Sequence, residues 1–295
     1  MRKNLLPLIV ILGPTASGKT SLAVKLCQKF NGEIVSADSR QIYKEMNIGT
    51  NKEHDLLIKQ HMIDIAEPYE IISMAKYKTK ALKCIKQIQS KNKLPFLVGG
   101  TGLYISAIVN NLQIPKAKPN PVLRKRLNEK SLEDLQKIIK TLDPETAEVI
   151  EIKNKRRLIR ALEVKLSTGK SFQAQQKKGK AFFNTLQIGI KIEKQKLYKR
   201  IDKRVNNMID QGLAHEVELL LKKYSPNLPS MSGIGYKEIR EYLNRKITLA
   251  QAINLIKTHT RQYARRQIQW FKRDHGIKWI KNYNQAEKLV KNFLK

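Results

Sequence analysis

Cysteine is scarce in this sequence, and long apolar runs are missing. Cys27 and Cys84 are the only two cysteines among 295 residues, which excludes a disulfide framework and, with no Cys-x-x-Cys pair, a zinc site. No stretch reaches the roughly 18 apolar residues that a membrane span needs. The apolar run at 5–12 superficially resembles a signal peptide, but it leads directly into a glycine-rich motif without a small-residue cleavage site, so we interpret it as a buried strand. These absences predict a cytoplasmic globular protein with no metal cluster and no membrane partner.

Acidic residues are also few. Lys and Arg number 58 against 25 Asp and Glu, which gives a formal net charge of +33 and a pI near 10.1. An excess of this size predicts a polyanionic partner, such as a nucleic acid, an acidic membrane surface or a phosphorylated substrate. A lysine-rich proteome that solvates its helices with Lys would give a similar composition, so charge alone leaves the partner open.

Apolar runs of strand length alternate with helical periodicity in the first hundred residues. Continuous apolar runs occupy 5–12 and 94–98, a shorter one occupies 33–36, and helical patterns cover 21–30 and 74–90. This alternation is typical of an α/β fold in which a parallel sheet is covered by helices on both faces.

The pattern changes near residue 115, where three prolines lie among Lys and Asn and indicate a linker. Helix starts follow at Ser131, with a capping-box-like sequence, and at Asp143, which precedes a proline. A third helical pattern, 155–168, stops at a glycine. The sequence therefore predicts a mostly helical insertion domain over 116–182.

The core pattern returns after the insertion. A strand is predicted at 186–192, and long amphipathic helical stretches follow at 195–224 and 248–273. The predicted catalytic core thus comprises 1–115 and 183–295.

The segment after the first predicted strand fits G-x-x-x-x-G-K-[ST] at every position. Its residues are Gly13, Pro14, Thr15, Ala16, Ser17, Gly18, Lys19 and Thr20. Glycines let backbone N–H groups turn towards phosphate oxygens, and the helix that follows adds the positive end of its dipole. Lys19 would supply a charge to the terminal phosphate, and the Thr20 hydroxyl is placed for Mg²⁺. The motif predicts a bound di- or triphosphate without saying which one, or which reaction.

Polar and glycine-rich segments follow the next two predicted strands. Asp38 comes just after the second strand, at the edge of a parallel sheet where ligands bind, so we expect it beside the phosphate loop. A carboxylate there can act as general base or hold Mg²⁺, although Asp also commonly caps a helix. The third strand ends in Gly99, Gly100, Thr101 and Gly102. Three glycines in four positions exceed what a plain turn needs and indicate a close approach by a ligand.

Taken in order, these motifs resemble those of the tRNA dimethylallyltransferase (tRNA isopentenyltransferase) family. The matching segments are 13–20 (GPTASGKT), 36–43 (SADSRQIY), 61–64 (HMID), 99–104 (GGTGLY), 156–163 (RRLIRALE), 197–205 (LYKRIDKRV), 234–238 (IGYKE) and 260–271 (TRQYARRQIQWF). The phosphate loop alone is generic, whereas the ordered set is highly specific. The chain lacks the cysteines of the zinc finger that eukaryotic members carry, so it resembles the compact bacterial form.

The resemblance implies a P-loop NTPase-like fold and prenyl transfer. Family members join dimethylallyl diphosphate to N6 of the adenosine at tRNA nucleotide 37, 3′ of the anticodon, and release pyrophosphate. For this chain it implies Asp38 and Thr101 as catalytic residues, with Asp38 accepting the proton from N6. It further implies Arg204 and Arg261 as diphosphate contacts beside the phosphate loop, Mg²⁺ near Thr20, and a monomer.

Contacts to the anticodon stem-loop of tRNA are implied at a further set of matching positions. These are Asp38, Ser39, Arg40, Gln41, Thr101, Arg124, Arg156, Arg157, Leu158, Ile159, Arg160, Gly235, Tyr236 and Lys237. The residues themselves add a basic cluster, since five of the eight positions 153–160 are Lys or Arg, although a solvated helix surface would look the same. Tyr263 and Trp270 share a helix face and can either stack on bases or pack in the core.

Two other functions remain open from the residues alone. A small-molecule or nucleotide kinase could use the same phosphate loop, but kinases need an acidic strand end for Mg²⁺, and no apolar strand ending in Asp is evident after residue 100. A non-catalytic RNA-binding protein would account for the charge, but neither for the phosphate loop nor for Asp38.

Overall fold

The computed structural model describes residues 5–53, 57–115 and 117–295. The chain divides into two compact units. The first, called here the core unit, comprises Met1–Val109 and Phe182–Lys295, and the second, the helical unit, comprises Asn110–Ala181. The division lies close to the predicted boundaries at 116 and 182.

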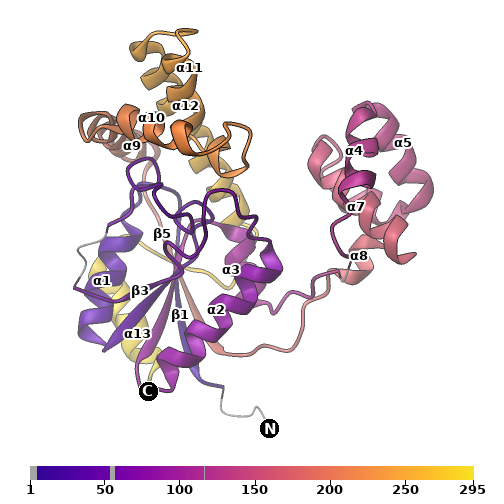
Figure 1. Ribbon diagram of the computed structural model, residues 1–295. Helices are drawn as coiled ribbons and strands as arrows, with labels where there is room; N and C mark the ends of the chain where they lie inside the picture. The colour runs from indigo at the N-terminus through magenta and orange to yellow at the C-terminus, as the bar shows by residue number, and fades with distance from the viewer. Residues whose placement is uncertain (1–4, 54–56, 116) are drawn as a thin grey trace. The chain divides into compact units, whose positions relative to one another are not determined.

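A six-stranded sheet forms the centre of the core unit (Figure 1). Its strand order is β3-β2-β4-β1-β5-β6, and every pairing is parallel. The strands are β1 (Pro7–Leu12), β2 (Gly32–Ser36), β3 (Gln60–His61), β4 (Leu94–Gly99), β5 (Asn184–Ile190) and β6 (Lys278–Ile280). Leu12 is paired with Gly99, and Ser36 with Val98, so the carboxyl ends of β1, β2 and β4 lie at one edge. The α/β fold with a parallel sheet is confirmed.

Helices cover both faces of this sheet. α2 (Met74–Gln89) and α3 (Gly102–Val109) pack with Leu8, Val10 and Leu12 on one face. On the other face, α1 (Lys19–Lys29) and α13 (Tyr283–Phe293) pack with Ile9 and Ile11. Alternate residues of β1 thus serve opposite faces, as the two-residue period of a strand requires. The burial on both faces explains why the strand is a continuous apolar run.

A second group of helices lies beyond the carboxyl ends of the strands (Figure 1). It comprises α9 (Lys194–Asp210), α10 (Leu213–Lys223), the 3₁₀ turn η1 (Ser230–Ser232), α11 (Tyr236–Leu243) and α12 (Leu249–Phe271). Their apolar faces form one cluster with residues of the segment after β2, including Ile42 and Met46. The predicted helical stretch 195–224 is interrupted because Gly212 adopts φ +93°, a left-handed conformation that glycine tolerates without strain.

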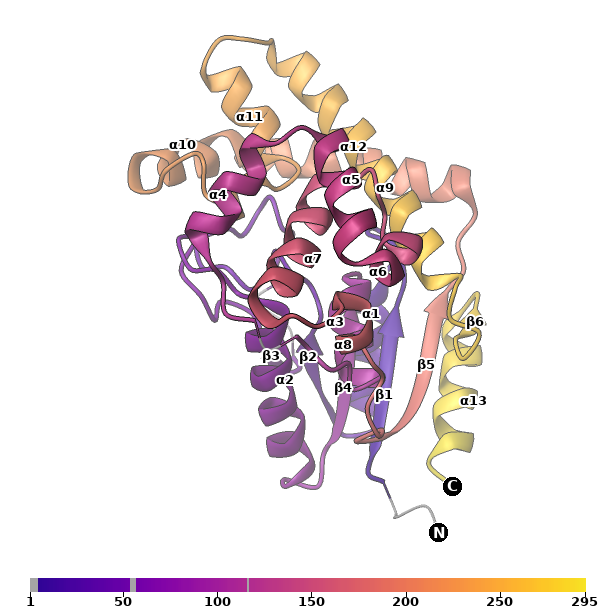
Figure 2. The same ribbon diagram turned by 90° about the vertical axis from the view of Figure 1, so that its right-hand side faces the viewer.

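The described residues of the helical unit form five helices, and α7 lies against α4 and α5 (Figure 2). They are α4 (Pro121–Glu129), α5 (Leu132–Leu142), α6 (Pro144–Val149), α7 (Lys155–Thr168) and α8 (Phe172–Gln175). The predicted helix signals are confirmed: Ser131 and Asp134 form a capping box, Asp143 caps α6, and Gly169 ends α7 with φ +70°. Leu135, Ile139 and Leu162 are fully buried in its small core.

Within the described residues, no helix combines the length and the apolar character that crossing a membrane would require.

Candidate active site

A cavity of about 1130 Å³ opens in the core unit at the carboxyl edge of the sheet. The phosphate loop lines it from Thr15 to Thr20, Asp38 and Gln41 line it from the segment after β2, and Gly99 lines it from the end of β4. Lys196, Arg200, Arg204 and Gln267 line it from α9 and α12. The cavity therefore gathers the phosphate loop and Asp38 at one place, although they come from different segments of the chain.

The phosphate loop has the backbone that its motif predicts. Gly18 adopts φ +93° directly before α1, so the chain turns into the helix at a position that glycine tolerates. Ala16 adopts φ +60°, a conformation that non-glycine residues rarely take. The Ser17 hydroxyl is buried without a hydrogen-bond partner. A strained turn and an unpaired hydroxyl indicate a loop shaped for a ligand.

Positive charge dominates the lining of the cavity. The cationic side chains are Lys19, Lys25, Lys191, Lys196, Arg200, Arg204 and Lys281, and the carboxylates are Asp38, Glu53 and Glu193. Desolvation lowers the pKa of Lys19 to about 8, an effect that Asp38 opposes and Arg204 reinforces. Desolvation also lowers the pKa of Arg204. Desolvation makes the charged forms of Lys19 and Arg204 less stable than they are in water, and a bound anion would stabilise them. The cavity therefore favours a ligand with several negative charges.

Helix α9 supplies two arginines that contact the phosphate loop directly. Arg204 donates from Nη1 to the Thr15 hydroxyl at 3.2 Å, and Arg200 donates from Nη1 to the Ser17 carbonyl at 3.1 Å. The predicted placement of Arg204 beside the loop agrees with this geometry. Arg200 and Lys196 were not predicted as site residues. Lys196, Arg200 and Arg204 follow one another at intervals of four residues, which places all three on one helix face, and the sequence shows this spacing.

Asp38 and Thr101 are brought close together by the loops after β2 and β4. The Asp38 Oδ1 accepts a hydrogen bond of 2.9 Å from the Arg40 amide. The Thr101 hydroxyl accepts one of 3.0 Å from the Ser39 amide, and the Thr101 amide donates to the Ala37 carbonyl at 3.1 Å. Asp38 lines the cavity. The hydrogen bonds of Thr101 to Ala37 and Ser39 hold the backbone on both sides of Asp38.

The glycines after β4 leave room for protein atoms. A Cβ would lie 2.2 Å from the Ala37 carbonyl oxygen at Gly99, and 2.2 Å from the indole of Trp270 at Gly102. At Gly100 it would lie 2.2 Å from Nε2 of Gln267. The glycines predicted a close approach by a ligand. At these positions the atoms that approach the backbone closely belong to Ala37, Gln267 and Trp270.

One face of α12 closes this part of the site. Burial, followed by the charge of Asp38, raises the pKa of the Tyr263 hydroxyl to about 12, an effect that Arg40 and Thr101 oppose. Trp270 packs against the core cluster under α3. Between them, Gln267 accepts from the Thr15 amide at 2.8 Å and donates to the Gly100 carbonyl at 2.9 Å. Gln267 was not predicted, since nothing local distinguishes it from the other glutamines of this helix.

Arg261 has a different environment from the one predicted. Its Nη2 donates to both carboxylate oxygens of Asp202 at 2.6 Å, and its guanidinium lies 5.2 Å from the ring centroid of Tyr198. It is not among the residues that line the cavity. Arg261 therefore forms an ion pair between α9 and α12 in this structure, and its contact with the diphosphate stays a prediction.

Arg40 and Gln41, predicted to contact tRNA, are held by the protein. Arg40 donates to the carbonyls of Pro229 and Ser230 at 2.8 and 3.1 Å. Gln41 donates to the carbonyls of Thr50 and Asn51 at 3.3 and 3.2 Å, and its side-chain oxygen accepts from Ser36. These bonds fix Gln41 in the cavity wall.

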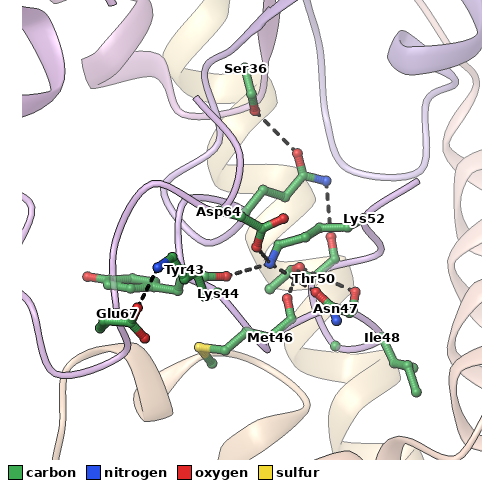
Figure 3. A network of polar contacts seen from close by, with 12 residues as sticks. Ser36, Tyr43, Lys44, Met46, Asn47, Ile48, Thr50, Lys52, Asp64 and Glu67 are labelled. Atoms are coloured by element: carbon green, nitrogen blue, oxygen red, sulfur yellow. Dashed lines mark hydrogen bonds and ion pairs between the residues drawn. The ribbon is translucent and has the colours of Figure 1, made fainter. Parts of the chain in front are cut away.

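A buried ammonium stabilises the loop that carries Gln41 (Figure 3). Lys52 donates to Asn47 Oδ1 at 3.1 Å, to Asp64 Oδ1 at 2.5 Å and to the Tyr43 carbonyl. Burial lowers the pKa of Lys52, and its hydrogen bond with Asp64 opposes that effect. Lys52 thereby ties Tyr43 and Asn47, in the segment after β2, to Asp64, which follows β3.

Tyr236, another predicted tRNA contact, is buried. It is 1% exposed, and its hydroxyl donates to Glu216 Oε1 at 2.8 Å. Gly235 is also buried, whereas Lys237 is exposed. The side chain of Tyr236 packs in the interior, Lys237 is the member of this segment that faces solvent, and contact of the segment with tRNA stays a prediction.

Of the residues predicted to contact RNA in the helical unit, some are buried and others are exposed. Leu158 is 0% and Ile159 8% exposed, so the side chains of both pack in the helical core, and their contact with tRNA stays a prediction. Glu163, fully buried, accepts two hydrogen bonds of 2.8 Å from Arg124 and one of 2.5 Å from Arg160. Arg156 and Arg157 are exposed.

Comparison with known proteins places these features in a family. The family model described as IPP transferase matches residues 41–274, and the one described as isopentenyl transferase matches residues 6–63. A tRNA dimethylallyltransferase of Halothermothrix orenii is 44% identical, with 99% of this chain and 96% of the relative covered. One of Acetivibrio thermocellus is 43% identical, with 96% and 95% covered.

Solved structures give the same result. The tRNA isopentenylpyrophosphate transferase of Bacillus halodurans superimposes with a TM-score of 0.73 and 34% identity over 98% of this chain and 95% of that one. A eukaryotic dimethylallyltransferase acting on tRNA superimposes with a TM-score of 0.81 and 28% identity over 97% of this chain and 77% of that one.

Proposed function

Because the chain belongs to the IPP transferase family of tRNA dimethylallyltransferases, we propose that it transfers a dimethylallyl group from dimethylallyl diphosphate to N6 of the adenosine at tRNA nucleotide 37, giving N6-isopentenyladenosine and pyrophosphate. The observation that carries the proposal is that one cavity is lined by the phosphate loop, the cations of α9 and Asp38. The alternative of a kinase has no support from the relatives.

The phosphate loop binds the diphosphate as a leaving group. As the bond between C1 of the dimethylallyl group and the diphosphate oxygen breaks, that oxygen takes the electron pair and negative charge grows on it. Lys19 and Arg204 line the cavity where this charge develops. Their attraction for it strengthens towards the transition state, which lowers the barrier.

Asp38 accepts the proton that the nucleophile must lose. N6 of the adenosine forms the new bond to C1 and releases one proton, which passes to the Asp38 carboxylate. Asp38 is suited to this role because it lines the cavity together with the phosphate loop. Thr101 acts through its hydrogen bond to the Ser39 amide and holds the Asp38 segment in place.

The residues present fit a bound Mg²⁺. Thr20 lines the cavity at the end of the phosphate loop. Among the described residues, no group of three or more His, Cys, Asp or Glu could enclose a metal ion. A threonine hydroxyl suits Mg²⁺, which keeps several waters and binds chiefly through phosphate oxygens. When bound, the ion would offset negative charge on the diphosphate.

The tRNA is bound through its phosphates. Arg156 and Arg157 of the helical unit and Lys237 of the core unit are exposed, and they provide charge for an RNA backbone. The target adenosine must leave its stack to reach the cavity, at a cost of roughly a few kcal/mol that these contacts offset.

One assay tests the proposal. The protein is mixed with Mg²⁺, dimethylallyl diphosphate and an anticodon stem-loop that carries three adenosines 3′ of the anticodon, and the RNA mass is measured. We expect a gain of one C₅H₈ unit that is lost in Asp38→Asn. A parallel reaction contains ATP in place of the prenyl donor. No RNA mass gain with dimethylallyl diphosphate, together with phosphate released from ATP in the parallel reaction, would favour the kinase instead.

A further inference from the structure

Gln267 connects two loops of the site that are far apart in sequence. Its side-chain oxygen accepts from the Thr15 amide of the phosphate loop at 2.8 Å, and its Nε2 donates to the Gly100 carbonyl at 2.9 Å. These partners lie 252 and 167 residues away. The side chain is 6% exposed, so both bonds form largely away from water.

A primary amide is suited to this position because it combines an acceptor and a donor on one planar group. The Thr15 amide needs an acceptor, and the Gly100 carbonyl needs a donor. A carboxylate would offer only acceptors, and an apolar side chain would leave both backbone groups unpaired. The absence of a side chain at Gly100 is required as well, since a Cβ there would lie 2.2 Å from Nε2.

The two loops carry different parts of the proposed chemistry. The first carries Lys19, which contacts the leaving group in the proposed reaction. The second continues into Thr101, whose hydroxyl holds the Ser39 amide next to Asp38. Gln267 therefore spans the distance between the group that binds the diphosphate and the segment that positions the base.

We propose that Gln267 is a positioning residue that sets the phosphate loop and the Asp38 segment at the separation required for transfer. The proposal rests on the proposed function. Gln267 lines the cavity, but both ends of its side-chain amide are bonded to backbone groups of the protein, so it acts by fixing the two loops. A shift of about 1 Å between reacting groups can lower a rate on the order of 10²-fold.

Three variants test this role. Gln267→Met keeps a similar shape and removes both hydrogen bonds. Gln267→Glu keeps the acceptor for Thr15 and faces the Gly100 carbonyl with an oxygen that can donate only when protonated. Gln269→Met is the matched control, because Gln269 lies on the same helix and is exposed. All three are compared below their unfolding temperatures, with folding checked by circular dichroism.

We expect Gln267→Met to lower kcat on the order of 10²-fold, with the Kd for the anticodon stem-loop equal to that of Gln269→Met. In Gln267→Glu, the activity relative to wild type should rise as the pH falls, because the introduced carboxyl gains a proton and regains its donor. The same ratio for Gln267→Met should be independent of pH. A structural role alone would not produce this pH profile in folded protein.

Activity in Gln267→Met equal to that of Gln269→Met would overturn the proposal. A wild type that binds the stem-loop but transfers no prenyl group would contradict the proposed function instead. In that case, hydrogen exchange of the Thr15 amide and the Kd for inorganic pyrophosphate test separately whether Gln267 connects the two loops. Faster exchange and weaker pyrophosphate binding in Gln267→Met would support the connection between the loops, and unchanged values would exclude it.

Discussion

Arg204 of α9 donates a hydrogen bond of 3.2 Å to the hydroxyl of Thr15 in the phosphate loop, and the two residues lie 189 positions apart. The guanidinium is desolvated, which lowers its pKa, and Asp38 is the carboxylate that most opposes this effect. One helix thus delivers a fixed cation to a loop that already carries Lys19, which concentrates positive charge in the cavity.

Removing this guanidinium should slow transfer. In Arg204→Gln the leaving diphosphate loses a preorganised donor, and we expect kcat/KM to fall about 10²-fold, as for other donors that stabilise developing charge. Steady-state kinetics with dimethylallyl diphosphate and the stem-loop measure the loss. The control is Lys203→Gln, which removes the same charge from the neighbouring, exposed position. Equal kinetics in the two variants would show that only net charge matters.

Binding of the prenyl donor should depend on the protonation of Lys19. Its pKa is lowered to about 8 in the free protein, because desolvation outweighs the attraction of Asp38. A bound diphosphate favours the charged ammonium and raises that pKa, so binding takes up a proton. The affinity for dimethylallyl diphosphate should therefore be greatest below about pH 8 and decrease as the pH rises above it, by up to about tenfold per unit.

Calorimetry without RNA, from neutral pH to above pH 9, would measure this decrease. Lys19→Arg is the control, since a guanidinium stays charged throughout this range. Its affinity should not change with pH above neutrality. A decrease of the same size in Lys19→Arg would assign the effect to another group.

The helical unit should depend on one buried carboxylate. Burial raises the pKa of Glu163, but hydrogen bonds from Arg124, the Asn120 amide and Arg160 outweigh that effect and hold it below its usual value. Glu163→Ala leaves two partly buried guanidinium groups without their partner, and we expect a loss of about 2 kcal/mol in unfolding free energy. Urea unfolding combined with hydrogen exchange in α7 measures it. Glu151→Ala removes the exposed partner of Arg157 and should cost at most about 0.5 kcal/mol.

Local sequence patterns predicted the strands and loops whose signal lies within a short contiguous segment. The apolar runs of β1 and β4 are visible because both faces of these strands are buried. The phosphate loop is a contiguous motif and was found complete. In contrast, β3 (Gln60–His61) and β6 (Lys278–Ile280) have two and three residues and produce no pattern of their own.

Local patterns do not predict which residues distant in sequence pair with one another. The partner of Arg261 is Asp202, 59 residues away, and no local pattern predicts this ion pair. Leu158 lies beside exposed arginines on α7, yet the helix turns it into the core. Which cations face solvent and which neutralise buried carboxylates depends on tertiary packing, and the charge count of the sequence is the same in either case.

The exposed cations of α7 should therefore account for RNA binding in the helical unit. In the double variant Arg156→Gln and Arg157→Gln we expect weaker binding of the stem-loop and a salt dependence reduced by about one to two units of slope, because each phosphate contact contributes about 0.7–0.9. The KM for dimethylallyl diphosphate should not change, since neither residue lines the cavity. Fluorescence anisotropy over a series of salt concentrations measures both affinity and slope. Lys140→Gln provides the control, because it removes an exposed charge from α5 of the same unit. An unchanged slope in the double variant would show that these arginines do not contact RNA phosphates.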